Sequence, residues 1–372
     1  ISMRNICFFN SIKFWGGGEK LHLENAIEFK KINYNVFLAC KLNSTLWKKA
    51  AIEKIQTFPI TVGNISFMNP FKLLRLILFY RNNNIDTVIF SSSQDLKTGS
   101  ISAYLAGVER IVYLRGLAVP IKNSLVNRII FKHILTHIIP NSEETKRNML
   151  KYLGKYVSDE RVKTIYHGID LEKLKCADDD KLEIIREKGH GIILGNAGRL
   201  TKQKGQDKLI DIAKKLKERD IDFTLFIAGT GELQTELEGL IDKYHLNNNV
   251  ILLGFIKDME IFMNSIDIFL LTSIWEGFGF VLVEAMIKSK PIVAFDITSN
   301  PEVIEGNRSG FLVDYPDLDM FAKKTSMLME DESLRKTMGY EGAKIVKERF
   351  ILGDRVREIE SYLITTASST KS

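Results

Sequence analysis

The sequence predicts an α/β protein made of two domains, each built on a parallel sheet. Short apolar runs alternate with helix-like segments almost throughout. The 372 residues suffice for about two domains, and a dozen strands would be too many for one ordinary sheet. Hydrophobic residues make up 45% and charged residues 26%, as in globular proteins generally. We therefore expect two Rossmann-like domains in tandem.

The first half alternates strand and helix patterns from its start. Its expected strands are short apolar runs, as buried parallel strands require. They are Arg4–Asn10, Tyr34–Cys40, Thr87–Ser91, Arg110–Leu114, Thr136–Pro140 and Val162–Tyr166. A glycine-rich loop and a helix pattern reaching about Lys31 follow the first strand. We expect an N-terminal Rossmann-like domain over residues 1–170.

The second half repeats this rhythm more clearly. Its expected strands are Ile192–Ala197, Phe223–Ala228, Val250–Leu253, Ile268–Thr272, Pro291–Phe295 and Phe311–Val313. After the first of them, Leu209, Ala213 and Leu216 recur at helical spacing and predict a helix with one apolar face. The polar segment Cys176–Lys188 is typical of a linker. We expect a C-terminal Rossmann-like domain over residues 171–353.

Composition excludes several classes of protein. No stretch approaches the ~20 apolar residues of a membrane-spanning helix. The cysteines Cys7, Cys40 and Cys176 lie far apart, which argues against a disulfide framework or a zinc site. Ile1–Asn10 has the pattern of a strand and not of a signal peptide. These observations predict a cytoplasmic protein.

Charge is distributed unevenly along the chain. Residues 1–166 hold 24 basic and 11 acidic side chains, a net charge of +13. Residues 167–372 hold 28 basic and 35 acidic side chains, a net charge of −7. Such asymmetry indicates an anionic partner for the first half. On charge alone, nucleic acid, anionic lipid and phosphorylated substrates all remain open.

Two segments of the first half are candidates for contact with an anionic membrane. Leu46–Lys49 places a tryptophan beside two lysines, and Lys122–His133 has the pattern of a basic amphipathic helix. The alternative is that both segments pack on the sheet and leave only a solvated basic edge.

The strongest motif runs from Glu276 to Glu284. It follows the expected strand Ile268–Thr272, and ligands of open α/β sheets bind at the carboxyl ends of strands. Its glycines permit close approach of a ligand, and a helix expected from Phe280, with Glu284 near its first turn, adds an anion-binding end. The two carboxylates suit hydroxyl groups of a sugar and a ribose. The alternative is a helix-stabilising Glu284 and a surface Glu276.

A second motif, Gly198-Arg199-Leu200 with Lys204, also follows an expected strand. Arg199 and Lys204 are suited to a diphosphate because both are cationic hydrogen-bond donors. The alternative is a solvated basic loop.

Three further glycine-containing loops end expected strands. Gly16–Gly18 permits a tight turn against phosphate, although it does not match the dinucleotide-binding pattern. Gly229–Gly231 is either a nucleotide loop or, as we favour, a tight turn. Phe255, beside Gly254, is a candidate for lining a base pocket.

Taken together, these motifs resemble those of retaining glycosyltransferases of the GT-B fold, family 4. The resemblance covers about 350 residues, and no single motif would suffice. Its parts are Gly17-Gly18-Glu19, Pro140-Asn141-Ser142-Glu143, Ile165–Asp170, Gly198-Arg199-Leu200 with Lys204-Gly205, Ala228–Gly231, Glu276–Glu284 and Pro301–Ile304. The resemblance implies two Rossmann-like domains facing across a cleft, with the acceptor on the first and the nucleotide-sugar on the second. It also implies a last helix, about 354–366, that packs back on the first domain.

The resemblance also implies roles for individual residues. Arg199 and Lys204 would grip the diphosphate, Glu276 the donor sugar and Glu284 the ribose. Gly17 and Gly18 would close over the phosphates. The remaining donor-binding residues would be Gly198, Phe255, Gly277, Phe278, Gly279, Phe280 and Val281.

Arg115 departs from the family pattern. Many members carry a histidine near the reacting carbon, where this chain has Arg115 after an expected strand. Arg115 could stabilise the departing phosphate or bind an anionic acceptor. The alternative is a structural ion pair.

The expected function is therefore metal-independent, retaining hexosyl transfer from a nucleoside-diphosphate sugar, most simply UDP-linked. Asp178–Asp180 falls in the linker and is interpreted as a solvated acidic run, not a metal site. The acceptor would be a glycan or lipid-linked precursor of bacterial surface polysaccharide or lipopolysaccharide. We expect no cofactor and no nucleic-acid partner, and a cytoplasmic location, peripheral on the inner face of the cytoplasmic membrane. A sugar-nucleotide epimerase and an inactive nucleotide-sugar-binding protein remain open.

Overall fold

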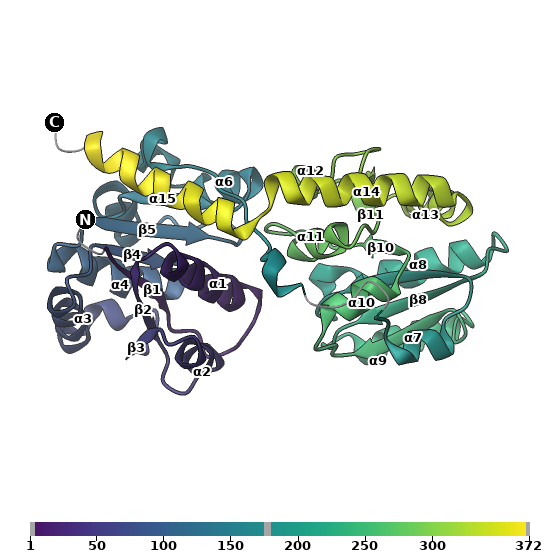
Figure 1. The fold of residues 1–372 in the computed structure, drawn as a ribbon, viewed down its shortest axis with the longest axis horizontal. Coiled ribbons are helices and arrows are strands. Elements are labelled where there is room, and N and C mark those ends of the chain that lie inside the picture. The colour runs from purple at the N-terminus through teal and green to yellow at the C-terminus, as the bar shows by residue number, and fades with distance from the viewer. Residues whose placement is uncertain (1–3, 175–179, 370–372) are drawn as a thin grey trace. The chain divides into compact units, whose positions relative to one another are not determined.

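The computed structural model describes residues 4–174 and 180–369 (Figure 1). Cys176, Asp178 and Asp179 lie outside these ranges. The chain forms two compact units. Unit 1 comprises residues up to Gly168 together with those from Leu352 onward, and unit 2 comprises Ile169–Ile351. Each unit carries one six-stranded parallel sheet, which confirms the predicted fold class.

The sheet of unit 1 has the strand order β3-β2-β1-β4-β5-β6. Its strands are β1 Asn5–Asn10, β2 Asn35–Cys40, β3 Gln56–Pro59, β4 Thr87–Phe90, β5 Arg110–Arg115 and β6 His137–Pro140. The direction of winding reverses between β1 and β4. This pair of strands is therefore the switch point of the sheet, where open α/β sheets bind ligands.

Two strand predictions for unit 1 were wrong. Val162–Tyr166 is not a strand, although Lys163 and Ile165 donate their amides to Ile138 and Pro140 carbonyls of β6. Only one bridge forms, between Ile138 and Val162, because Pro140 has no N–H to continue the ladder. The edge strand β3 was missed because it is short and its apolar pattern is weak.

The helices of unit 1 cover both faces of its sheet. Residues Ile6 and Phe8 of β1 join one hydrophobic cluster and Cys7 and Phe9 the other, as the alternation of a strand requires. The helices are α1 Gly17–Lys31, α2 Thr45–Ile52, α3 Pro70–Asn82, α4 Ser93–Ala106, α5 Leu125–Ile129, α6 Glu143–Leu150 and α15 Leu352–Ser369. The first cluster contains residues of α1, α2 and α15, and the second contains residues of α3 and α4.

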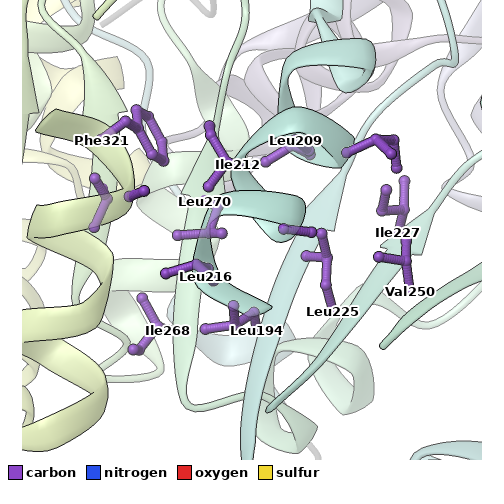
Figure 2. Packing of buried hydrophobic residues seen from close by; sticks show 14 of the residues in the cluster. Leu194, Leu209, Ile212, Leu216, Leu225, Ile227, Val250, Ile268, Leu270 and Phe321 are labelled. Carbon is purple, nitrogen blue, oxygen red and sulfur yellow. The ribbon is translucent and has the colours of Figure 1, made fainter. Parts of the chain in front are cut away.

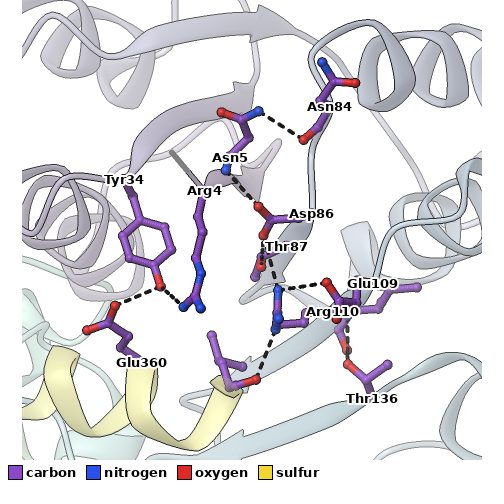
Figure 3. A network of polar contacts seen from close by, with 12 residues as sticks. Arg4, Asn5, Tyr34, Asn84, Asp86, Thr87, Glu109, Arg110, Thr136 and Glu360 are labelled. Atoms are coloured by element: carbon purple, nitrogen blue, oxygen red, sulfur yellow. Dashed lines mark hydrogen bonds and ion pairs between the residues drawn. The ribbon is translucent and has the colours of Figure 1, made fainter. Parts of the chain in front are cut away.

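Helix α15 belongs to unit 1 although it lies far along the chain (Figure 3). The Tyr34 hydroxyl donates to Glu360 at 2.9 Å and accepts from Arg4 at 3.1 Å. The Arg110 guanidinium donates to the Leu363 carbonyl at 3.1 Å and also pairs with Asp86. Buried Leu352 and Val356 complete the cluster against β1 and α1.

The sheet of unit 2 has the strand order β12-β11-β10-β7-β8-β9, so its switch point lies between β10 and β7. All six expected strands form. They are β7 Ile192–Ala197, β8 Phe223–Ala228, β9 Val250–Gly254, β10 Ile268–Leu271, β11 Ile292–Phe295 and β12 Gly310–Val313.

The core of unit 2 lies between this sheet and its helices (Figure 2). The predicted helix α8 turns Leu209, Ile212 and Leu216 toward strand residues such as Leu194 and Leu225. The helices are α7 Glu183–Lys188, α8 Gln206–Lys217, α9 Gln234–Lys243, α10 Met259–Ser265, α11 Phe280–Ile287, α12 Asn300–Val303, α13 Leu318–Glu330 and α14 Glu332–Arg349. Among the described residues, no helix combines the length and apolar character needed to span a bilayer.

Candidate donor-binding site

The expected site residues of unit 2 gather at the switch point of its sheet. The loop after β7 carries Arg199 and Lys204, and the loop after β10 carries Glu276. These strands are hydrogen-bonded neighbours although the two loops lie about 70 residues apart in sequence. The fold therefore brings together two motifs that sequence analysis could only place at the same edge.

The segment Gly229–Gly231, which follows β8, packs against the backbone of the Arg199 loop. A Cβ on Gly229 would lie 1.9 Å from the Gly198 carbonyl oxygen, and one on Gly231 would lie 2.3 Å from the Leu200 carbonyl oxygen. The Leu200 amide donates to the Thr230 carbonyl at 3.0 Å. Turn residues begin only at Glu232, so a tight turn at Gly229–Gly231 stays a prediction, while both glycines permit close backbone packing.

Lys204 and Glu276 form an ion pair at the centre of the site. Lys204 Nζ lies 2.6 Å from Glu276 Oε1, and the side chains are 18% and 8% exposed. The Ser273 hydroxyl donates to the same Oε1 at 2.6 Å. A Cβ on Gly198 would lie 3.4 Å from Lys204 Cδ, so the lysine stem rests against this glycine. Partial burial weakens the solvent screening of this pair and so strengthens the attraction between the two side chains.

Arg199 extends the positive charge toward solvent. Its side chain is exposed, while its carbonyl accepts a hydrogen bond from Gln206 Nε2 at 3.0 Å. Gln206 is fully buried at the start of α8 and fixes the backbone from which Arg199 projects. An exposed guanidinium and a half-buried lysine in the same loop are suited to a diphosphate that is partly enclosed.

The backbone at Glu276 is fastened from both sides. Its amide donates to Thr298 Oγ1 at 3.0 Å, and its carbonyl accepts from Ser299 Oγ at 3.3 Å. From the loop after β7, Gln203 Nε2 donates to the Trp275 carbonyl at 3.1 Å. The carboxylate is thus positioned by loops from three neighbouring strands.

Gly279 makes the transition from this loop into α11. It has φ +73°, a left-handed conformation that favours glycine, and it caps the helix. Phe278 is buried with its ring 5.5 Å from that of Phe350, while Gly277, Phe280 and Val281 are half-buried.

Helix α11 begins at Phe280, as expected, and Glu284 is its fifth residue, just past the first turn. No acidic residue occupies the first turn, so the alternative that Glu284 is a first-turn acid was wrong. A role in offsetting the charge of the helix terminus is therefore weakened, and the half-buried side chain points to a contact role.

Phe255 lies at the same edge of the sheet, after β9. Its side chain is 76% exposed. The Gly254 carbonyl, just before Phe255, accepts a hydrogen bond from the Gly229 amide at 2.7 Å. This bond links the loop after β9 to the segment Gly229–Gly231, which packs against Gly198. An exposed aromatic ring at a ligand-binding edge is suited to stacking on a base.

Gly17 and Gly18 lie in unit 1, at the start of α1. They are the first two residues of the helix and not part of a tight turn, so the expected turn was wrong. A Cβ on either glycine would meet nothing within 4 Å. The absence of side chains there leaves the amides of the helix terminus open to a ligand.

Arg115 also lies in unit 1, and it is buried. Its guanidinium donates to Ser93 Oγ at 2.9 Å, to the Tyr113 hydroxyl at 3.1 Å and to the Leu117 carbonyl at 3.0 Å. A weaker bond reaches the Val119 carbonyl at 3.4 Å. These acceptors are neutral, so the ion-pair alternative was wrong. The geometry favours positioning of the loop after β5 over direct contact with an anion.

The switch point of unit 1 holds a carboxyl group that sequence analysis missed. Asp95, fully buried in the first turn of α4, accepts hydrogen bonds from the amide and the hydroxyl of Ser11, which follows β1. Burial raises the pKa of Asp95 to about 6, although the bonds from Ser11 lower it in part. The carboxyl group fastens the start of the loop that leads to Gly17 and Gly18.

Sequence reasoning also missed Ser273, Thr298 and Ser299. Each follows an expected strand of unit 2, so the rule that placed Glu276 at the sheet edge could have included them. Among the described residues, no group of three histidine, cysteine, aspartate or glutamate side chains could hold a metal ion.

The two six-stranded parallel sheets, one in each unit, form the architecture of the GT-B fold. Residues 178–345, which contain Arg199, Lys204, Glu276 and Glu284, match the family model "Glycosyl transferases group 1". This stretch, a little under half of the chain, is similar to the group 1 glycosyl transferases.

Proteins that are similar to the chain are also named as glycosyltransferases. The chain is 30% identical to the capsular polysaccharide biosynthesis glycosyltransferase CapM of Staphylococcus aureus over 61% of this chain and 58% of CapM. It is 26% identical to an Escherichia coli UDP-Gal:alpha-D-GlcNAc-diphosphoundecaprenol alpha-1,3-galactosyltransferase over 86% of both chains. The crystal structure of Anabaena HepE with UDP and glucose superposes with a TM-score of 0.81 at 22% identity, covering 96% of this chain and 98% of HepE. That likeness shows the shared fold.

Proposed function

We propose that the chain is a retaining glycosyltransferase that moves a hexose from a UDP-linked sugar to a glycan or lipid-linked acceptor. The observation that carries this proposal is the Lys204–Glu276 ion pair at a switch point, with the carboxylate buried and the exposed Arg199 in the same loop as Lys204. Cations suit the diphosphate and the carboxylate suits sugar hydroxyls. The donor would bind to the domain of residues 171–353 and the acceptor to that of residues 1–170.

In this proposal Glu276 uses its two oxygens differently. Lys204 and Ser273 both contact Oε1, and neither contacts Oε2. Oε2 would accept from a donor-sugar hydroxyl, while Lys204 bridges the carboxylate and the diphosphate. Because the pair is held before substrate arrives, it needs little reorganisation as charge develops in the transition state.

The departing diphosphate would be stabilised by cations and backbone dipoles. Arg199 and Lys204 would neutralise its charge, and the amides from Gly277 to Val281 would add donors at the start of α11. This arrangement supports a metal-independent reaction, in which the phosphate oxygen helps to take the acceptor proton. Glu284 would accept from the ribose, and Phe255 would stack on the base.

The identity of the donor and the acceptor rests on similarity. The Escherichia coli relative matched over 86% of both chains is named for a UDP-galactose donor and a diphosphoundecaprenol-linked acceptor. The Staphylococcus aureus relative is named for capsular polysaccharide biosynthesis. We therefore propose a role in bacterial surface polysaccharide or lipopolysaccharide assembly, in the cytoplasm and peripheral on the inner face of the cytoplasmic membrane.

A panel of nucleotide-sugars tests this proposal. A donor should raise the unfolding temperature, because it binds only the folded state, and slow hydrolysis should release free sugar. The reaction should survive EDTA; complete loss with EDTA, restored by manganese, would refute metal independence. Release of an altered sugar nucleotide would indicate an epimerase, and stabilisation without turnover a binding protein.

A further inference from the structure

The outer face of α3 is apolar although it faces solvent. Phe71, Leu74 and Leu78 are 81%, 53% and 48% exposed. Just before α3, Ile65 and Met68 are 76% and 73% exposed. We call these five residues the α3 face. Their spacing within the helix, at i, i+3 and i+7, places Phe71, Leu74 and Leu78 on one side.

The opposite side of α3 is apolar as well. Leu76 and Tyr80 are buried against the core of unit 1. A helix that is apolar on both sides is normally covered on both sides, and a contiguous exposed apolar patch marks an interaction surface. The α3 face therefore indicates an interaction surface that extends along the whole helix, which is about 20 Å long.

The surroundings of the α3 face are basic. From Lys54 to Ile85 the chain contains four lysine and arginine residues and no acidic residue. Arg75 lies 5.0 Å above the Phe58 ring, and Arg81 donates to the Leu105 carbonyl at 3.0 Å. Lys72 Nζ donates to the Thr61 carbonyl at 2.9 Å. These contacts are to neutral groups, so the positive charge remains available to an anionic surface.

The two segments expected to meet a membrane are less suitable. Leu46 is 1% exposed, and Trp47 packs against the core, so the apolar side of α2 turns inward. In the second segment, Ile130 and Phe131 are fully buried, although Leu125 remains 70% exposed. Both segments use apolar residues to cover the sheet, as the alternative expected, so contact of either segment with a membrane stays a prediction that this packing does not favour.

We propose that the α3 face docks on the surface of an anionic lipid bilayer. Phe71, Leu74 and Leu78 would enter the boundary between headgroups and acyl chains, and the neighbouring cations would contact the headgroups. An apolar line flanked by arginines and free of carboxylates suits such a surface. The proposal deepens the proposed function, since a lipid-linked acceptor is presented at a bilayer, but the docking itself needs no donor.

Tryptophan fluorescence tests the contact directly. In Phe71→Trp, vesicles of phosphatidylcholine with 30% phosphatidylglycerol should shift the emission to shorter wavelength, and brominated lipids should quench it. Ile52→Trp is the matched control, because Ile52 is 76% exposed at the end of α2 in the same unit. Equal responses of the two variants, or none in Phe71→Trp, would overturn the proposal.

Sedimentation with the same vesicles measures the contribution to binding. The double variant Leu74→Asp/Leu78→Asp should weaken binding by about tenfold or more, because charge replaces two exposed leucines that the bilayer would bury. Ile52→Asp should bind like the wild type, and circular dichroism should show both variants folded. Vesicle binding unchanged by the double variant would exclude the α3 face. A second result would also exclude it: the wild type forms a concentration-dependent dimer and does not bind vesicles, and the double variant is a monomer.

Donor hydrolysis without vesicles separates the two proposals. It should be the same in the double variant and in the wild type, because the α3 face lies outside the donor-binding residues. If the wild type binds vesicles but hydrolyses no nucleotide-sugar, the proposed function fails and the docking surface stands.

Discussion

The two units place a carboxyl group at the same topological point but surround it differently. In unit 2, Glu276 pairs with Lys204 and accepts from Ser273. In unit 1, Asp95 accepts from the amide and hydroxyl of Ser11, and among the described residues no cation pairs with it. The first carboxyl group contacts a cation and a hydroxyl, whereas burial raises the pKa of the second and favours its protonated form.

This difference shows that a shared fold does not fix the chemistry of its switch point. The cation–carboxylate pair of unit 2 is suited to a ligand that carries both phosphate and hydroxyl groups. The carboxyl group of unit 1 instead ties the loop after β1 to α4. The residues that follow each strand, and not the sheet itself, decide which chemical groups each switch point offers.

The largest effect is expected from Glu276→Gln. If Glu276 contacts the donor sugar where charge develops, kcat should fall by about 10²–10³-fold, as when one preorganised electrostatic contact is lost. Steady-state kinetics with the identified donor measures this. Calorimetry with free UDP is the control and should show nearly unchanged affinity. Loss of UDP binding in this variant would mean that Glu276 serves the nucleotide end.

Asp95→Asn should change the pH dependence of stability. The pKa of Asp95 is raised in the folded protein to about 6, so its stabilising contribution is full below the unfolded value near 4 and is lost as pH rises through 6. Between pH 4 and 7 the wild type should lose about 2 kcal/mol relative to the variant.

Urea unfolding at both pH values measures that difference. Burial lowers the pKa of His22 to about 3 and those of His137 and His167 to about 4, so these histidines destabilise the fold as pH falls below 6.5. They are present in both proteins, and their effect cancels in the comparison. Parallel pH profiles for the two proteins would show that Asp95 is not held as a buried acid.

Ser273→Ala should lower kcat by about tenfold, because one hydrogen bond to the ionised Glu276 is lost. The KM for the donor and the affinity for UDP should change little. Ser273→Thr, which keeps the hydroxyl group, should recover much of the activity. If alanine lowers only the unfolding temperature and leaves kcat intact, Ser273 merely supports the fold.

The smallest kcat effect is expected from Glu284→Gln. Its proposed ribose contact is the same before and during transfer, so the variant should mainly raise the KM for the donor. Calorimetry should show weaker binding of free UDP, in contrast to Glu276→Gln. UDP affinity equal to that of the wild type would remove the ribose assignment.

Sequence reasoning located edges better than contacts. The position of Lys204 and Glu276 after strands followed from periodicity, because parallel sheets bind ligands at their carboxyl ends. The ion pair between Lys204 and Glu276 could not be predicted in this way, because it depends on β7 and β10 becoming neighbours in the sheet. The predicted strand Val162–Tyr166 failed because Pro140 lies in the neighbouring strand, and the sequence pattern does not show which strands become neighbours. The neutral partners of Arg115 depended on how the loop after β5 folds back.

Helix α15 also has a consequence for the order of events during synthesis. Unit 1 completes one of its hydrophobic clusters with Leu352 and Val356, which leave the ribosome only after all of Ile169–Ile351. Unit 2 is continuous and can close its core while unit 1 still exposes apolar side chains along β1 and α1. The nascent chain therefore carries its first-made domain in an unfinished state, open to chaperones, until the last helix docks.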